Sequence, residues 1–491
     1  MAAGAERGSG IPAFDPAVLF SLVALTFYTA VSLYGIAGRL LSITYPIGVF
    51  LVACLCYFRS PGVYLAFTFW VWLVTPFARR VYDLHYGFHA TSTLLLAPLA
   101  ASSLAIITVL RRRRLLRNGI YIPFVIALAA LTYAYLIGVI RQSVVAATYD
   151  LFTWITPISF GMHVALEWRR FPQTRTALTR AALWGLLVVA SYGIWQFVDP
   201  PIWDRVWVVN AEMFSVGAPL PFLIRVFSTL NAPGPFTIML IFCLFIGLSA
   251  NQAWRAIPLA LGLVALILTK GRSAWGAFLI GAFVMQIRQP LRALPRQWAV
   301  ILSVFVLAAP LVFQPRILST FTRRAATLGN LEHDRSFQAR GDLTEAALGR
   351  LAGDPTGAGL GGFGGATKLL ANSKLANALD SGPLEIYAIM GWIGGTLFMM
   401  SLVAIVLQIV RTRRVKYEAV TSAAVSAVIA LLVTSIFGDI FNSASGFFFW
   451  TALGLATAGR THAAATDLAM RLDRLPAPTR RLPSPTGKTA A

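Results

Sequence analysis

Long apolar runs follow one another along nearly the whole chain, separated by short charged or Pro- and Gly-containing segments. Most of them approach the ~20 apolar residues that a helix needs to cross a bilayer, and they exceed the ~10 residues of a membrane strand. The runs therefore predict an all-α fold, a polytopic membrane bundle of about 12–14 transmembrane helices. Fourteen candidate helices lie near residues 18–37, 40–57, 62–78, 90–110, 119–140, 148–166, 181–198, 234–250, 256–269, 274–287, 299–314, 383–410, 418–438 and 443–459.

The composition excludes a water-soluble enzyme. Hydrophobic residues make up 57% of the 491 residues and charged residues only 12%, about half the share of an ordinary soluble domain. The three cysteines, Cys54, Cys56 and Cys243, all lie in apolar runs. Their spacing predicts neither a disulfide framework nor a metal site.

The net charge of +22 follows from 41 basic and 19 acidic residues. Cytoplasmic loops of membrane proteins collect Lys and Arg. If the helices alternate from a cytoplasmic N-terminus, 25 basic residues lie inside and 8 in short outer loops, while 8 more lie in the long segment 315–382. Long loops do not follow this rule. We therefore predict that both termini are cytoplasmic, and the charge requires no nucleic-acid partner.

This topology divides the chain into two parts. Residues 1–459 form a membrane domain with two polar extracytoplasmic loops, a large one at 315–382 and a smaller one at 199–233. Residues 460–491, rich in Pro, Ala and Arg, are predicted to be a disordered basic cytoplasmic tail. Because the inner loops are short, the chemistry is expected on the outer side.

Two short basic motifs at predicted outer helix ends are candidates for holding a phosphate group. One is Thr269-Lys270-Gly271-Arg272, and the other runs from Arg225 to Asn231-Ala232-Pro233. A guanidinium matches phosphate oxygens with two parallel hydrogen bonds, which an ammonium lacks. The alternatives are interfacial anchoring by snorkelling side chains for the first motif and a plain loop for the second.

The end of the large outer loop carries a third candidate. A Gly-rich stretch at 357–365 follows no strand, which excludes the phosphate loop of soluble nucleotide folds. Asp380-Ser381 comes next, just before the predicted helix that begins at Pro383. Asp380 is therefore either a functional carboxylate or a helix N-cap. Gly391 and Gly394 further on are either part of a motif or sites of close helix packing.

Acidic residues at two other places are also considered as functional candidates. Asp439 is either an interfacial residue or part of a cation path. Glu332-His333-Asp334 has no other histidine nearby in the loop, and we interpret it as solvated loop residues. No metal site is predicted.

Taken in order, the motifs resemble those of the O-antigen ligase and polymerase (Wzy-like) superfamily of polytopic glycosyltransferases. The resemblance covers roughly residues 180–440 and is carried by the Arg225 turn, Thr269-x-x-Arg272 with Ala274-Trp275-Gly276, and Asp380-Ser381-x9-Gly391-x-x-Gly394. Ligases of this family carry a histidine where this chain has Asp380, whereas polymerases vary there. The departure favours a polymerase.

The resemblance implies a polymerase of lipid-linked oligosaccharide repeat units of O-antigen, capsule or exopolysaccharide in a bacterial inner membrane. The donor would be a polyprenyl diphosphate, a leaving group that needs no proton, so no metal or other cofactor is expected. Asp380 and Arg272 would be catalytic, and Arg225, Lys270 and Asn231 would bind the diphosphate or sugar. Membrane lipid and a chain-length regulator are the other expected partners.

Two alternatives remain open. A ligase would transfer the glycan to lipid A–core or another acceptor. A flippase or exporter of lipid-linked oligosaccharides would place charges at mid-depth in the bundle, whereas the apolar runs here are nearly free of charge. If Asp380 proves to be only a cap, Glu385 or Asp342 becomes the next candidate for the base.

Overall fold

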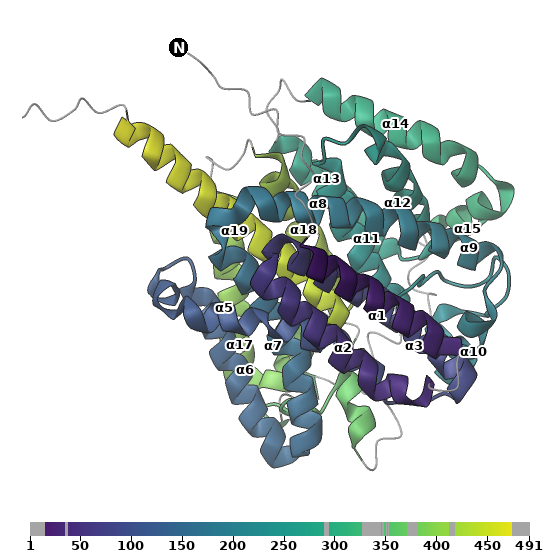
Figure 1. The fold of residues 1–491 in the computed structure, drawn as a ribbon, viewed down its shortest axis with the longest axis horizontal. Helices are drawn as coiled ribbons and strands as arrows, with labels where there is room; N and C mark the ends of the chain where they lie inside the picture. Colours follow the sequence, from purple (N-terminus) through teal and green to yellow (C-terminus); the bar gives the residue numbers. More distant parts are fainter. Residues whose placement is uncertain are drawn as a thin grey trace, which may run out of the picture.

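The computed structural model of the chain describes residues 15–34, 38–288, 294–326, 353–370, 381–411 and 418–473, together with the isolated positions 345, 348, 349, 351 and 379. Every element of regular structure in these ranges is a helix, and the helices pack into one bundle (Figure 1). The all-α prediction is confirmed.

The predicted apolar runs fall mainly on helices within the described ranges. One run is divided between α4 and α5, and another is formed by α8, the π-helical turn η4 and α9. The bounds are α1 Pro16–Tyr34, α2 Gly38–Arg59, α3 Pro61–Tyr86, α4 Leu96–Ser103, α5 Ala105–Arg111, α6 Ile122–Arg141, α7 Val144–Leu166, α8 Phe171–Gly185, η4 Leu186–Ala190, α9 Ser191–Val198, α10 Ile202–Asn210, α11 Pro233–Leu248, α12 Ala256–Leu268, α13 Arg272–Ile287, α14 Leu294–Val312, α15 Pro315–Ala326, α17 Gly382–Arg411, α18 Ala419–Ser435 and α19 Ser443–Asp473.

Seven helical segments of the described chain are long and apolar enough to cross a membrane. Five further apolar helices are shorter, with 10–17 residues. These lengths and compositions confirm a polytopic helical membrane protein. The seven segments are Pro16–Tyr34, Gly38–Arg59, Pro61–Tyr86, Thr93–Arg111, Ile122–Arg141, Trp168–Val198 and Gly382–Arg411.

Polar contacts sort the helix ends into two groups. At one end, which we call the arginine-run end after η2 (Arg113–Arg117), Arg112 pairs with Glu167 and Arg175 with Glu418. At the other, which we call the glycine-loop end after residues 357–365, the backbone of Gly361 bonds Asp150. These contacts bring together the C-terminal ends of α5 and α7, and the N-terminal parts of α8 and α18, as the predicted alternation of helix directions requires for these four helices.

The centre of the bundle is built on close packing between α7 and α19. A Cβ added at Gly454 would lie 2.2 Å from the carbonyl oxygen of Gly161, so only glycine permits this approach. Trp450 on α19 is fully buried and donates its indole N–H to the carbonyl oxygen of Phe441 at 2.9 Å. Large apolar side chains instead point outward on peripheral helices, for example Phe20 and Phe305.

Two helices extend beyond their predicted ends. The apolar run ends at 78, but α3 continues to Tyr86 because Arg79 pairs with Asp83 one turn later at 3.2 Å, so both charges are accommodated within the helix. Likewise α19 continues to Asp473. Residues 460–473, predicted to begin a disordered tail, are therefore helical, and their Ala-rich sequence favours that state.

Candidate functional site

The structure brings the two basic motifs together, although they are far apart in the sequence. The guanidinium of Arg225 donates from Nε to the carbonyl oxygen of Thr269 at 3.1 Å and from Nη1 to that of Ser215 at 3.0 Å. Lys270 donates from Nζ to the carbonyl oxygen of Leu223 at 3.0 Å. The segments around Arg225 and Lys270 thus form one cationic cluster at the glycine-loop end.

Arg272 lies at the first residue of α13, directly after the tight turn that closes α12. Lys270 in this turn has a left-handed backbone with φ of 56°. The turn is fixed from the other side by Trp275, whose indole N–H donates to the carbonyl oxygen of Leu266 at 3.1 Å. We call Arg225, Lys270 and Arg272 the basic cluster.

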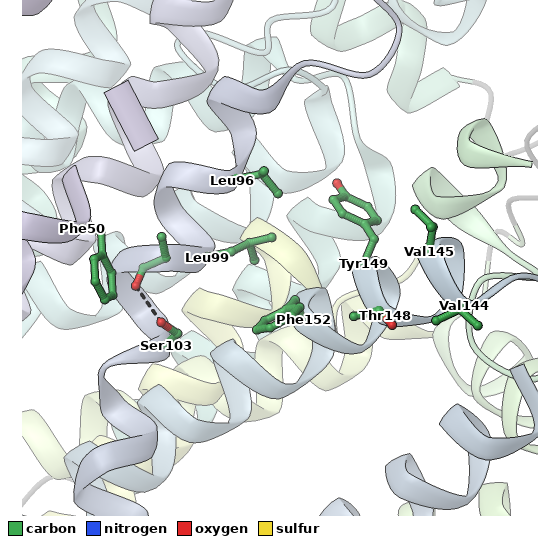
Figure 2. A pocket seen from close by; sticks show the side chains of 10 residues that line it. Phe50, Leu96, Leu99, Ser103, Val144, Val145, Thr148, Tyr149 and Phe152 are labelled. Atoms are coloured by element: carbon green, nitrogen blue, oxygen red, sulfur yellow. Dashed lines mark hydrogen bonds between the residues drawn. The ribbon is translucent and has the colours of Figure 1, made fainter. Parts of the chain in front are cut away.

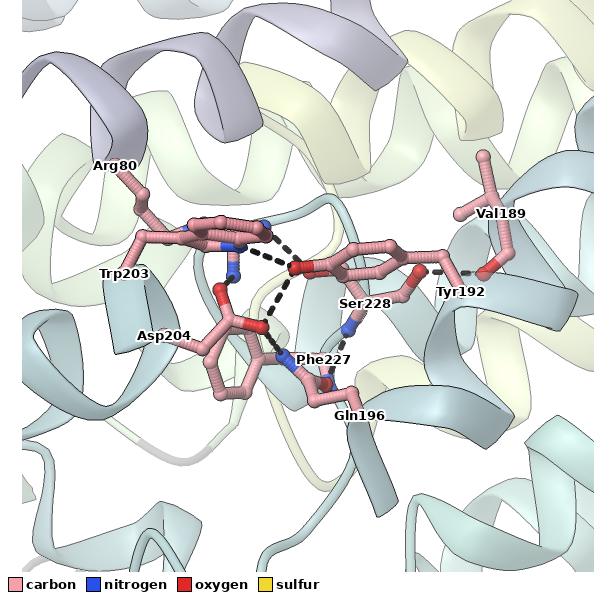
Figure 3. Close-up of polar contacts among 8 residues, drawn as sticks. All are labelled: Arg80, Val189, Tyr192, Gln196, Trp203, Asp204, Phe227 and Ser228. Atoms are coloured by element: carbon pink, nitrogen blue, oxygen red, sulfur yellow. Dashed lines mark hydrogen bonds and ion pairs between the residues drawn. The ribbon is translucent and has the colours of Figure 1, made fainter. Parts of the chain in front are cut away.

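A buried polar network holds the turn that follows Arg225 (Figure 3). The side-chain oxygen of Gln196, on α9, accepts the backbone N–H groups of Phe227 at 3.0 Å and Ser228 at 2.9 Å. Arg80, on α3, donates from Nη2 to the carbonyl oxygen of Ser228 at 2.5 Å. Ser228 has a left-handed φ of 53°, so this turn depends on its partners to hold its shape.

The network is centred on an ion pair between Arg80 and Asp204. Nη1 of Arg80 lies 2.8 Å from Oδ1 of Asp204, and both side chains are 0% exposed. The other carboxylate oxygen accepts from Gln196 at 2.6 Å and from the hydroxyl of Tyr192 at 2.8 Å. Burial raises the pKa of Asp204, and the charge of Arg80 opposes that shift. The sequence did not single out Arg80, Gln196 or Asp204.

Asn231 ends the same turn, just before Pro233 starts α11. Its side-chain oxygen is buried and accepts no hydrogen bond from the described residues. A buried acceptor without a donor is costly, so the position is compatible with binding a ligand. Its predicted role in sugar or diphosphate binding stays a prediction.

The Gly-rich segment is a structural wedge between helices. Its backbone bonds α17 through Gly359, which donates to the carbonyl oxygen of Ile389 at 2.9 Å, and α6 through Leu360, which donates to that of Ala134 at 3.0 Å. A Cβ at Gly359 would lie 2.2 Å from the backbone nitrogen of Gly138. Facing it, α17 is kinked at Gly391, where φ is 64°. A Cβ at Gly391 would lie 2.4 Å from the carbonyl oxygen of Pro355, so this glycine permits a close approach of the loop backbone to α17.

Three carboxyl groups gather beside this wedge. Asp150 on α7 accepts the N–H of Gly361 at 2.8 Å. Glu385 on α17 is buried, and the charges of Asp439 and Asp150 both act on it. Asp439, between α18 and α19, accepts the N–H of Phe441 at 3.0 Å. Burial raises the pKa of Asp439 to about 6, against the opposing effect of that hydrogen bond. We call Asp150, Glu385 and Asp439 the carboxyl cluster.

The candidate base Asp380 lies outside the described residues, as do Asp342 and the segment Glu332-His333-Asp334. Glu385, the other alternative for the base, is described, and no hydrogen bond to its carboxylate is found there. Within the described part of the chain, no three His, Cys, Asp or Glu side chains come together in a way that would hold a metal ion. The carboxyl cluster is thus an electrostatic grouping.

One signal in the sequence marks Arg80, although not its partners Gln196 and Asp204. Eight basic residues lie in short loops on the predicted outer side, against the usual distribution. Four of them pair with acids in the structure, and Arg225 and Lys270 bond backbone carbonyls. The eight are Arg39, Arg79, Arg80, Arg141, Arg205, Arg225, Lys270 and Arg272.

Neither the protein-family models nor the curated proteins contain a match to this chain.

Proposed function

We propose that this protein is a membrane glycosyltransferase that polymerises lipid-linked oligosaccharide repeat units. The donor glycan leaves a polyprenyl diphosphate and is transferred to a sugar hydroxyl of the acceptor unit. The observation that carries the proposal is the contact of Arg225 with the carbonyl oxygen of Thr269, which gathers both predicted phosphate motifs into one basic cluster.

The proposed transfer reaction requires one base and correctly placed positive charge. A diphosphate leaves without a proton, so one base on the acceptor suffices, unlike the two carboxyl groups of glycoside hydrolysis. Negative charge grows on the diphosphate as the glycosyl bond breaks. Preorganised cationic donors stabilise that charge, each contributing about 2.7–4 kcal/mol by analogy with oxyanion-hole groups. The basic cluster offers such donors at a helix boundary.

The members of the basic cluster take different roles in this proposal. Arg272, at the start of α13, is the principal donor to the diphosphate. Arg225 uses Nε and Nη1 on backbone carbonyls, so it contributes charge and keeps the cluster assembled. Lys270 is a weaker phosphate ligand because it lacks the planar fork. Asn231 offers its amide to the sugar or diphosphate.

We propose that the base is a carboxyl group that belongs to the carboxyl cluster or is close to it in the sequence. Asp380 remains the first candidate, five residues before Glu385 in the sequence. Carboxyl groups that act on one another as Glu385, Asp439 and Asp150 do resist ionising together. One that loses its proton is therefore a stronger base than an isolated carboxylate, which suits removal of a hydroxyl proton.

We place the glycine-loop end on the extracytoplasmic side of a bacterial inner membrane. The distribution of basic residues supports this orientation, with 25 inside and 8 in short outer loops. Cysteines placed at 117 and 340 test it in intact cells with an impermeant reagent. Labelling at 340 and not at 117 is expected, and the reverse pattern would refute the orientation.

The decisive experiment uses purified protein and a synthetic diphosphate-linked repeat unit, with products separated on a gel. A ladder of lengthening glycans is expected. A product that appears only after a separate lipid acceptor is added would identify a ligase instead. Transfer of the intact lipid-linked unit across a vesicle membrane without glycosyl transfer would identify a flippase.

A further inference from the structure

An apolar groove opens on the side of the bundle between α2, α4 and α7 (Figure 2). Its volume is about 590 Å³, within the range of pockets that hold small ligands. Several wall residues, including Phe50, Leu96, Val145 and Phe152, are themselves well exposed. The groove is therefore open at a surface that faces lipid in a membrane.

The groove descends from the glycine-loop end toward the middle of the bundle. On α7 it is lined from Val144 to Phe152, a rise of about 12 Å at 1.5 Å per residue. That is somewhat less than half of the ~30 Å hydrocarbon core. Its shape and depth suit one extended hydrocarbon chain that enters from the outer leaflet.

The upper part of the groove adjoins positive charge. Tyr149 of α7 lines it, and the short helix η10 (Gly364–Leu369), which carries Lys368, packs against α7. Lys368 is exposed, and none of the described acids forms an ion pair with it. Arg79 is balanced by Asp83 at 3.2 Å. The surplus charge is thus that of Lys368, which complements an anionic lipid headgroup.

The groove and the basic cluster lie on different helices. The basic cluster is carried by the segments beside α12 and α13, whereas the groove is lined by α2, α4 and α7. Asp150, the residue after Tyr149, belongs to the carboxyl cluster and accepts the N–H of Gly361. A lipid in the groove therefore presents its headgroup on the side of the carboxyl cluster.

We propose that this groove holds the polyprenyl chain of the acceptor, the second lipid-diphosphate substrate, while the donor diphosphate occupies the basic cluster. The inference rests on the proposed function, because a polymerase that extends lipid-linked units must bind two such lipids together. A ligase with a single polyprenyl substrate has no need of the second site.

A substitution that narrows the groove tests the inference. Ala100 lines the groove, and Ala100→Trp fills it. Ala129, exposed on α6 and outside the groove, provides the matched control Ala129→Trp. The probe is a photoreactive polyprenyl diphosphate without a glycan, in nanodiscs that contain phosphatidylglycerol. We expect cross-links to segments 96–103 and 144–152 in the unaltered protein and the control, and about tenfold fewer in Ala100→Trp, a change of ~1.4 kcal/mol.

Elongation assays with two acceptors complete the test. Ala100→Trp should raise KM for a lipid-linked acceptor about tenfold and leave KM for a short-tailed acceptor unchanged. A raised KM for the donor instead would place the donor chain in the groove and overturn the inference. The inference would also be overturned if neither groove segment were cross-linked, or if excess phosphatidylglycerol competed the cross-links away. Cross-links without any elongation by the unaltered protein would refute the polymerase function and leave a lipid-diphosphate site.

Discussion

The two ends of the bundle use arginine in different ways. At the arginine-run end, Arg112 and Glu167 are 34% and 15% exposed, and Arg175 and Glu418 are 44% and 24% exposed. At the glycine-loop end, the side chains of Arg80 and Asp204 are both 0% exposed. Exposed pairs contribute about 0–1 kcal/mol, whereas removing one partner of a buried pair costs about 3–5 kcal/mol.

The comparison separates two tasks of positive charge in a membrane protein. The paired arginines of the arginine-run end are partly exposed, and ion pairs at such positions add little stability. Arg80 instead fixes a backbone turn, because it bonds the carbonyl oxygen of Ser228 while it pairs with Asp204. Arginine on the glycine-loop end thus determines local geometry, and that geometry assembles the basic cluster.

The largest expected effect comes from breaking the buried pair. Arg80→Met leaves Asp204 buried without its partner, so we expect a loss of about 3–5 kcal/mol in unfolding free energy. Arg112→Met, the control at the other end, should cost about 1 kcal/mol or less. Denaturant unfolding in one detergent measures both.

A double variant sharpens this result. Arg80→Met with Asp204→Leu removes both charges and should recover much of the lost stability, since apolar replacements of buried pairs are often neutral or stabilising. Equal losses for Arg80→Met and Arg112→Met would abolish the distinction between the two ends.

Arg272 is expected to control turnover rather than stability. Arg272→Ala should reduce the rate of glycan transfer about 100- to 1,000-fold, as loss of a preorganised donor does. Arg272→Lys should leave only a small remnant because the bidentate geometry is lost. Arg117→Ala, an exposed position at the arginine-run end, should have no effect. Near-normal activity of the Lys variant would mean that charge alone, or anchoring, is the role of Arg272.

The candidate base is tested by two amide substitutions. Asp380→Asn should fold and insert normally and lose at least about 100-fold in rate if Asp380 is the base. If Asp380 only caps the helix, Asn serves equally well and activity stays. Glu385→Gln is the partner experiment. A tolerated Asp380→Asn together with an inactive Glu385→Gln would transfer the assignment to Glu385.

The smallest effect concerns pH. Because burial raises the pKa of Asp439 to about 6, the folded protein binds a proton there more tightly than the unfolded chain does. The resulting stability is complete below pH ~4 and is lost as pH rises through 6. One pKa unit corresponds to about 1.4 kcal/mol, so the loss is at most about 3 kcal/mol.

The control for this titration is Asp354, whose pKa is shifted in the opposite direction. Bonds from Thr356 and Arg141 lower the pKa of Asp354, so its stabilisation disappears as pH falls. Asp439→Asn should reduce the decline of the unfolding free energy between pH 4 and 7, while Asp354→Asn should leave that decline intact. The decline is shared with Asp150 and Glu385, which act on the same cluster. If the dependence of unfolding free energy on pH were unchanged in Asp439→Asn, the decline would be assigned to Asp150 and Glu385.

The sequence predicted the helices well because hydropathy is a local property. It also marked Arg225 and Lys270 as candidates, and the alternation of helix directions placed them on one side. It did not predict the contact of Arg80 with Ser228, which spans 148 positions. A buried polar pair leaves no periodic trace, and the helix end predicted at 78 placed Arg79 and Arg80 in a loop. The presence of arginines in short loops on the predicted outer side was the sequence signal that could have pointed to Arg80.

The wedge formed by the Gly-rich segment has a consequence for how the chain is made. It is bonded to α6 through Ala134 and to α17 through Ile389, while Gly359 lies directly against Gly138. The ribosome produces α6 and α7 long before the wedge, which lies more than 190 residues further along the chain. Until the wedge is in place, α6 and α17 cannot complete the contacts that it makes with both of them. Biogenesis must therefore pass through an open bundle, and the last third of the chain closes it.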